Sequence, residues 1–157
     1  MRLIAVSAAA LLAACQGGRE VDQQLAERGD TAAMHRLCFD LTYGEHGLAQ
    51  DWVRARTWCA KGAAAGEASS QVLYAQLFEY GEGGMRSLDS AHYWYIRAGN
   101  QGHPHALYAL AVLYLRNDIP SPVPGIAEAL LDSAAAQGYE PAVHLRDSLR
   151  STGRHWP

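Results

Sequence analysis

A pattern of small and aromatic residues recurs along this chain with a period of 36 residues, as from Ala55 to Ala91 and on to Ala127. The clearest copy consists of Ala91, Trp94, Ala98 and Gly102. The copies on either side consist of Ala55, Trp58, Gly62 and Gly66, and of Ala127, Leu130, Ala134 and Gly138. A fixed period of this length is typical of chains that stack one helical unit after another. We therefore predict an all-α fold, an α-α superhelix built as a short solenoid of about three helical hairpins.

The period also predicts where each unit begins and ends. The predicted units are an N-terminal cap helix at 20–28, hairpins at 29–65, 66–101 and 102–137, a C-terminal cap helix at 138–151, and a tail at 152–157. Asp51 and Asp89 are expected to cap the second helices of the first two hairpins, because a carboxylate accepts hydrogen bonds from free N–H groups. Gly44 and Gly81 are expected to end the first helices, since glycine adopts the left-handed conformation common there.

The first helix of each hairpin carries a repeated apolar face. Its residues are Ala33, Leu37, Cys38 and Leu41, then Ser70, Tyr74, Ala75 and Phe78, then Ala106, Leu110, Ala111 and Tyr114. Spacings of four, five and eight residues place each set on one side of a helix, so these sets are predicted to form the core. Trp58 and Trp94 recur in phase with Leu130, and we interpret them as packing residues rather than ligand platforms.

The repeated pattern resembles the Sel-1-like repeat, a close relative of the tetratricopeptide repeat. The matching residues are clearest between Ser70 and Gly102: Tyr74, Ala75, Phe78, Gly81, Gly83, Asp89, Ala91, Trp94, Tyr95, Ala98 and Gly102. The resemblance covers about residues 29–150 and implies a scaffold that binds other proteins.

The first residues have the features of an export signal. A basic start followed by an apolar run over residues 1–14 is typical of a signal peptide and too short to span a membrane. The run ends in Leu12-Ala13-Ala14-Cys15, which resembles the lipobox of bacterial lipoproteins. The resemblance implies cleavage before Cys15, lipidation of that residue, and a tether over residues 15–19. The alternative is an ordinary signal peptide with an incidental cysteine.

The residue after the cysteine bears on the final location. Gln16 stands where an Asp would, by the same resemblance, hold a lipoprotein in the inner membrane. We therefore expect a protein of the outer membrane that faces the periplasm, in a host taken to be Gram-negative. We expect it to be a monomer.

Composition and motifs argue against several function classes. The net charge is −3, and no run of five like charges occurs, so clustered Lys and Arg for nucleic acid are absent. The chain contains no phosphate loop, nucleophile elbow or His-Glu-x-x-His sequence, so we predict no enzymatic activity. His103 and His105 form a close pair without a Cys or carboxylate at ligand spacing. We therefore expect no metal and no cofactor.

Two cysteines remain besides Cys15. Cys38 and Cys59 lie on opposite helices of the first hairpin, at positions that the repeat directs inward. An exported chain meets an oxidising compartment, which favours a disulfide between them. The alternative is a pair of small buried thiols.

The face opposite the core of each first helix is the candidate binding surface. It carries His35, Phe39 and Thr42, then Val72, Gln76 and Glu79, then Tyr108, Val112 and Leu115, with His144 in the C-terminal cap. This mixture of apolar, aromatic and hydrogen-bonding groups suits an extended peptide or a partner helix. The alternative is that Phe39, Val72 and Val112 belong to the core between repeats.

These features favour an envelope-anchored scaffold or adaptor that binds a periplasmic or envelope protein or peptide. Two alternatives belong to other classes. One is a cell-wall-associated hydrolase or penicillin-recognising protein, although such relatives carry cysteines in every repeat. The other is a passive structural or immunity-type protein.

Overall fold

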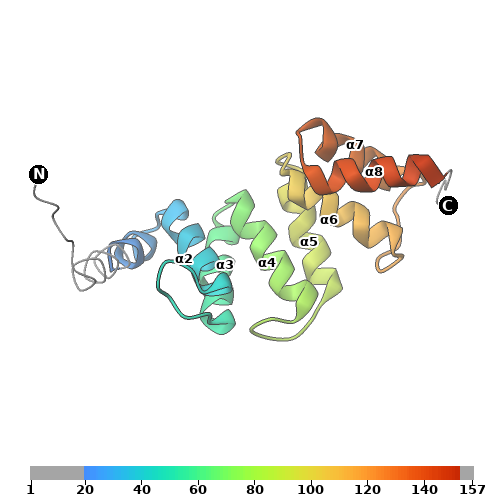
Figure 1. Cartoon of the computed structure of the whole chain (residues 1–157). Coiled ribbons are helices and arrows are strands. Elements are labelled where there is room, and N and C mark those ends of the chain that lie inside the picture. Colours follow the sequence, from blue (N-terminus) through green and yellow to red (C-terminus); the bar gives the residue numbers. More distant parts are fainter. Residues whose placement is uncertain (1–19, 153–157) are drawn as a thin grey trace, which may run out of the picture.

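The computed structural model describes residues 20–152, and these residues form helices without any strand. A helical segment at 20–27 comes first. The helices that follow are α2 (Thr31–Tyr43), α3 (Trp52–Ala64), α4 (Ala68–Tyr80), α5 (Leu88–Gly99), α6 (Pro104–Leu115), α7 (Ile126–Ala136) and α8 (Glu140–Thr152). Figure 1 shows them as one elongated array that advances from α2 at one end to α7 and α8 at the other. The predicted all-α superhelix is confirmed.

Each helix packs mainly on its neighbours in sequence. The hairpin pairs are α2 with α3, α4 with α5, and α6 with α7; α3 also packs on α4, α5 on α6, and α7 on α8. In addition, α2 packs directly on α4. Such an array has no central core shared by all units, so each repeat depends on the repeats beside it.

Most helix ends follow the predicted chemistry. Asp51 accepts a hydrogen bond from the Arg54 amide at 3.0 Å and caps α3. Gly44 and Gly81 follow α2 and α4 in the left-handed conformation, with φ of 74° and 76°. The prediction for α5 is wrong, because Asp89 lies inside its first turn.

Ser87 caps α5 instead, with its hydroxyl accepting from the Ser90 amide at 3.2 Å. The loop before α5 folds back on α4, where the Ser87 amide donates to the Phe78 carbonyl at 2.9 Å. Ser87 lies 36 residues after Asp51, so the cap of α5 keeps the period of the repeat, and Asp89 was the wrong residue two positions later.

The predicted core faces are buried, with the aromatic members at their margins. Ala33, Leu37, Cys38 and Leu41 of α2 are all buried, as are Ala75, Ala106, Leu110 and Ala111. Tyr74, Phe78 and Tyr114 are only partly buried and pack against the edges of the core. Ala91 and Ala111 are fully buried, consistent with close approach of the helices at these positions.

The third hairpin differs at its loop. Residues 117–125 contain three prolines, and Asn117 adopts a positive φ of 57°. α7 then begins without a side-chain cap after Gly125. Within residues 20–152 no helix combines the length and apolar character needed to cross a bilayer.

Candidate functional site

A shallow apolar hollow lies between α6 and α8. Its volume is about 220 Å³, and its lining residues are Tyr108, Val112, Leu115, Arg116, Leu145 and Leu149. α6 and α8 both pack on α7 but make far less contact with each other, which leaves this space between them. We call it the α6–α8 hollow.

Three of the predicted groove residues meet in this hollow, and three further residues join them. Tyr108, Val112 and Leu115 come from the predicted face of α6. Arg116, Leu145 and Leu149 were not predicted, although a four-residue spacing continues from Val112 to Arg116 and links Leu145 to Leu149. His144 is not among the lining residues; it is exposed and lies 3.5 Å from the Glu140 carboxylate.

Aromatic rings flank Tyr108. Its ring centroid lies 5.5 Å from that of Tyr139, which in turn stacks on His105 at 5.6 Å with an interplanar angle of 22°. The Nε2 atoms of His105 and Gln76 lie 3.4 Å apart in a hydrogen bond. Burial lowers the pKa of His105, so the ring is held neutral and can pack against Tyr139. The predicted residue Gln76 is thereby connected to the start of α6.

At the other end of the array, α2 presents a row of rings. The Phe39 centroid lies 4.8 Å from that of Tyr43 and 6.4 Å from that of His35. Phe39 and Tyr43 are both exposed. The prediction for Thr42 is wrong, because this residue is buried; its hydroxyl donates to the Cys38 carbonyl at 2.7 Å, and its carbonyl accepts from Gln50. Tyr43, the next residue, occupies the surface instead.

Val72 is also misplaced by the prediction. It is 3% exposed and packs in the apolar cluster shared by α4, α5 and α6. The repeat period places it correctly on α4, but the neighbouring units cover that part of the helix. The alternative of core between repeats therefore holds for Val72, whereas Phe39 is exposed and Val112 is only partly buried.

Glu79 joins the surface to the core of the second hairpin. Its carboxylate accepts a hydrogen bond from the Tyr95 hydroxyl at 2.8 Å. Burial raises the pKa of Tyr95 far above its usual value, and the adjacent Glu79 raises it further. Tyr95 therefore remains a neutral donor that orients Glu79.

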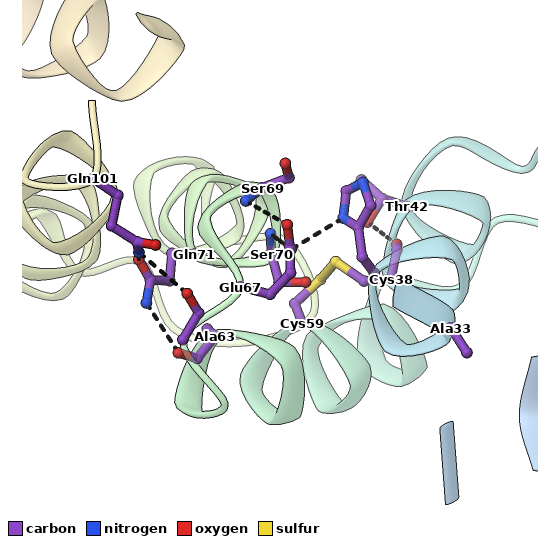
Figure 2. A network of polar contacts seen from close by, with 12 residues as sticks. Ala33, Cys38, Thr42, Cys59, Ala63, Glu67, Ser69, Ser70, Gln71 and Gln101 are labelled. Atoms are coloured by element: carbon purple, nitrogen blue, oxygen red, sulfur yellow. Dashed lines mark hydrogen bonds and ion pairs between the residues drawn. A yellow bond between two sulfur atoms is a disulfide. The ribbon is translucent and has the colours of Figure 1, made fainter. Parts of the chain in front are cut away.

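A polar network stiffens the junction between the first and second hairpins (Figure 2). Glu67 caps α4 by accepting from the amides of Ser69 and Ser70. Although burial opposes ionisation, the hydrogen bonds from these amides and the nearby His35 outweigh it and lower the pKa of Glu67. His35 lies beside this carboxylate, with 3.6 Å between its Nδ1 atom and an oxygen of Glu67.

Two glutamines continue the network toward the third hairpin. The buried Gln71 side chain donates to the Ala63 carbonyl at 3.1 Å. The Gln101 side chain donates to Gln71 Oε1 at 2.9 Å and to the Gly66 carbonyl at 3.2 Å. These bonds tie successive units together at their turns (Figure 2).

Cys38 and Cys59 form a disulfide in the structure, with their Cα atoms 4.9 Å apart. Both residues are fully buried, and the bond joins α2 to α3 (Figure 2). Of the other predicted residues, Cys15 and the signal segment lie outside the described part of the chain. Within residues 20–152, no group of three or more His, Cys, Asp or Glu side chains is placed to hold a metal ion.

The stacked hairpins define an α-solenoid protein of the tetratricopeptide-like type. The chain belongs to the Sel1 repeat family, whose model matches residues 31–67, 68–103 and 104–139. Each match begins at the first residue of α2, α4 or α6, two residues after the predicted starts of the hairpins. Proteins of this family are generally interaction scaffolds without enzymatic activity.

Two solved structures share the fold. One is c5321, a protective antigen present in uropathogenic Escherichia coli strains, with 20% identity and a TM-score of 0.78 over 87% of this chain and 29% of its own. The other is a Sel1 repeat protein from Oxalobacter formigenes, with 22% identity and a TM-score of 0.80 over 88% of this chain and 55% of its own. This chain thus spans little more than half of one and under a third of the other. No curated protein matches the chain.

Proposed function

We propose that this chain is an envelope-anchored lipoprotein that binds a periplasmic protein or peptide through the surface formed by its first helices. The α6–α8 hollow is the observation that carries the proposal. Its walls are mostly apolar, Tyr108 brings an aromatic ring, and Arg116 supplies a donor at the side. Aromatic and arginine side chains of this kind dominate the binding energy of many protein interfaces.

The size of the hollow favours a side chain as its occupant. Pockets for small molecules usually enclose about 300–1,000 Å³. The α6–α8 hollow, at about 220 Å³, is smaller and shallow. It suits one or two apolar side chains of a peptide or partner helix, with the rest of the partner lying along α6 toward Gln76.

Site-specific crosslinking in living cells tests this surface. A benzoylphenylalanine introduced at Tyr108 should form a discrete adduct with a partner protein after irradiation. Tyr93 is the matched control, because it is an exposed tyrosine on α5, outside the hollow. Adducts of equal yield from both positions, or from neither, would contradict the proposed surface and favour a passive structural role.

A second variant separates binding from folding. Tyr108→Ala should reduce adduct formation from a neighbouring probe at Val112, while the melting temperature changes little because Tyr108 is only partly buried. Tyr93→Ala should leave the adduct intact. Suppose instead that the Tyr108→Ala protein unfolds but captures the partner normally once it is refolded at low temperature. That result would assign Tyr108 to the core.

The anchor has its own test. Cys15→Ser should prevent acylation, leave the precursor uncleaved by the lipoprotein peptidase, and abolish incorporation of radiolabelled palmitate. The matched control is Cys38→Ala with Cys59→Ala, which removes the other two thiols and should leave labelling unchanged. Palmitate incorporation that persists in Cys15→Ser would refute the lipobox interpretation.

A further inference from the structure

Large exposed apolar side chains gather at one edge of the array. Of the nine such side chains in the described residues, five lie where the loops of the first two hairpins turn: Tyr43, Trp52, Val53, Tyr80 and Met85. Met85 is 86% exposed and Val53 is 66% exposed. We call these five residues the aromatic edge. Figure 1 shows the loops after α2 and α4 on the same side of the array.

Backbone contacts make this edge continuous. The start of α3 is held against α2 by a hydrogen bond from the Asp51 amide to the Leu41 carbonyl at 2.8 Å. The second loop packs against the same point, since a Cβ atom on Gly83 would lie only 2.2 Å from the Trp52 carbonyl oxygen. Arg56 donates to the Met85 carbonyl at 3.3 Å. Trp52, Val53 and Met85 are therefore neighbours.

The two tyrosines belong to the same region. They occupy equivalent positions, each being the last residue of its helix before a left-handed glycine. Each tyrosine stands directly before the loop that follows its helix, and these two loops meet where Gly83 packs on Trp52. The edge thus combines three aromatic rings that carry polar tips with two apolar side chains.

The chain leads from this edge toward Cys15. Segment 20–27 runs antiparallel to α2, because a tight turn joins them and the Arg36 guanidinium pairs with Asp22. Followed toward the N-terminus, segment 20–27 therefore leads in the direction of Tyr43. The five residues from Cys15 to residue 20 span at most about 17 Å when extended. A lipid on Cys15 would hold this side of the protein close to the bilayer.

We infer that the aromatic edge inserts into the interfacial layer of a phospholipid bilayer. The inference rests on the lipid anchor of the proposed function. Trp and Tyr rings favour this layer because their apolar bodies enter it while their polar tips remain hydrated. Charged groups around the edge have both signs, with Glu45, Asp51 and Glu82 beside Arg54 and Arg86. Burial of apolar surface, rather than attraction to anionic headgroups, therefore drives contact.

This orientation leaves the α6–α8 hollow free. The hollow is lined by residues of α6 and α8, and Figure 1 shows these helices at the end of the array opposite α2 and α3. The lipid-anchored protein would stand with its first two loops on the bilayer and present the hollow to the periplasm.

Spin labelling of the lipidated protein in vesicles of phosphatidylethanolamine and phosphatidylglycerol tests the inference. Met85→Cys supplies a labelling site, because the Cys15 thiol of the lipidated protein carries the diacylglyceryl group and Cys38 and Cys59 are bonded to each other. Ala65→Cys is the matched control, since Ala65 is exposed in the turn at the opposite end of α3. The label at 85 should show several-fold fewer collisions with a water-soluble nickel complex, and more with oxygen, than the label at 65.

Each outcome bears on a separate step. Val53→Cys should reproduce the result if the Met85 variant folds poorly, and high salt should not change it. Equal nickel accessibility at 85 and 65 in vesicle-bound protein would overturn the orientation but not the anchor. A wild-type chain that does not float with the vesicles would overturn both. Dipolar broadening between labels at 85 would identify a second copy of the chain as the occupant and overturn the membrane assignment.

Discussion

The first and third hairpins share one repeat but are held together differently. In the first, the Cys38–Cys59 disulfide joins α2 to α3, and both cysteines are fully buried. In the third, α6 and α7 are joined by the proline-containing loop and by packing of small residues such as Ala111. The first hairpin is the one nearest in sequence to the predicted tether, whereas the third borders the α6–α8 hollow.

This difference suggests a division between an end that resists disturbance and an end that binds. Because stability in a solenoid is approximately a sum of units and their interfaces, each end can be weakened separately. Under the proposed anchor, the disulfide would stabilise the hairpin nearest the membrane. A hollow that depends on packing alone can adjust to a partner. Three changes test whether the two ends are energetically separate.

The largest effect is expected from removing the disulfide. Cys38→Ala with Cys59→Ala should lower the free energy of unfolding by about 3 kcal/mol, because the closed loop restricts the unfolded chain. Hydrogen exchange should accelerate in α2 and α3 and change little in α6 and α7. Equal acceleration at both ends would show that the array unfolds as one unit and would remove the proposed division.

A bulky substitution in the third hairpin should have a somewhat smaller effect. Ala111→Leu should destabilise the protein by about 2 kcal/mol, because Ala111 is fully buried and added atoms force the helices apart. Exchange should accelerate in α6 and α7 but not in α2 and α3. Ala129→Leu is the control, since Ala129 is exposed on α7 and should change stability by less than about 0.5 kcal/mol. If Ala111→Leu left the free energy of unfolding unchanged, the third hairpin would be loosely packed.

Acidification should produce the smallest effect, with opposite signs at the two ends. Burial lowers the pKa of His103 and His105 below 6.5, so the third hairpin loses stability as the pH falls through that value. In the first hairpin, the hydrogen bond to Asp40 raises the pKa of His46. The contribution of His46 is complete below pH 6.5 and is lost as the pH rises through its folded pKa.

Hydrogen exchange on either side of pH 6.5, corrected for the intrinsic rates, measures this difference. Protection should fall in α6 relative to α2 as the pH is lowered. His105→Gln should reduce the change, and His144→Gln, at an exposed position, should not. Parallel changes in α2 and α6 would contradict the assignment of opposite signs.

The structure places some of the predicted surface residues in the hollow and buries others, for physical reasons. Tyr108, Val112 and Leu115 line the hollow because they lie near the open end of the array, where few units cover α6. Val72 has an equivalent position in its repeat but lies between two neighbours and is buried. Thr42 is buried beside Gln50, whose side chain donates to the Thr42 carbonyl, whereas the next residue, Tyr43, is exposed.

The sequence by itself determined the repeat, the helices and the inward face of each first helix, because these depend on spacings within a single hairpin. It also placed Cys38 and Cys59 on facing helices. Tertiary structure decided the burial of Val72 and the gathering of Leu145 and Leu149 with the residues of α6. Both features depend on the packing angle between successive hairpins. That angle results from contacts between residues far apart in the sequence, which no short-range spacing predicts.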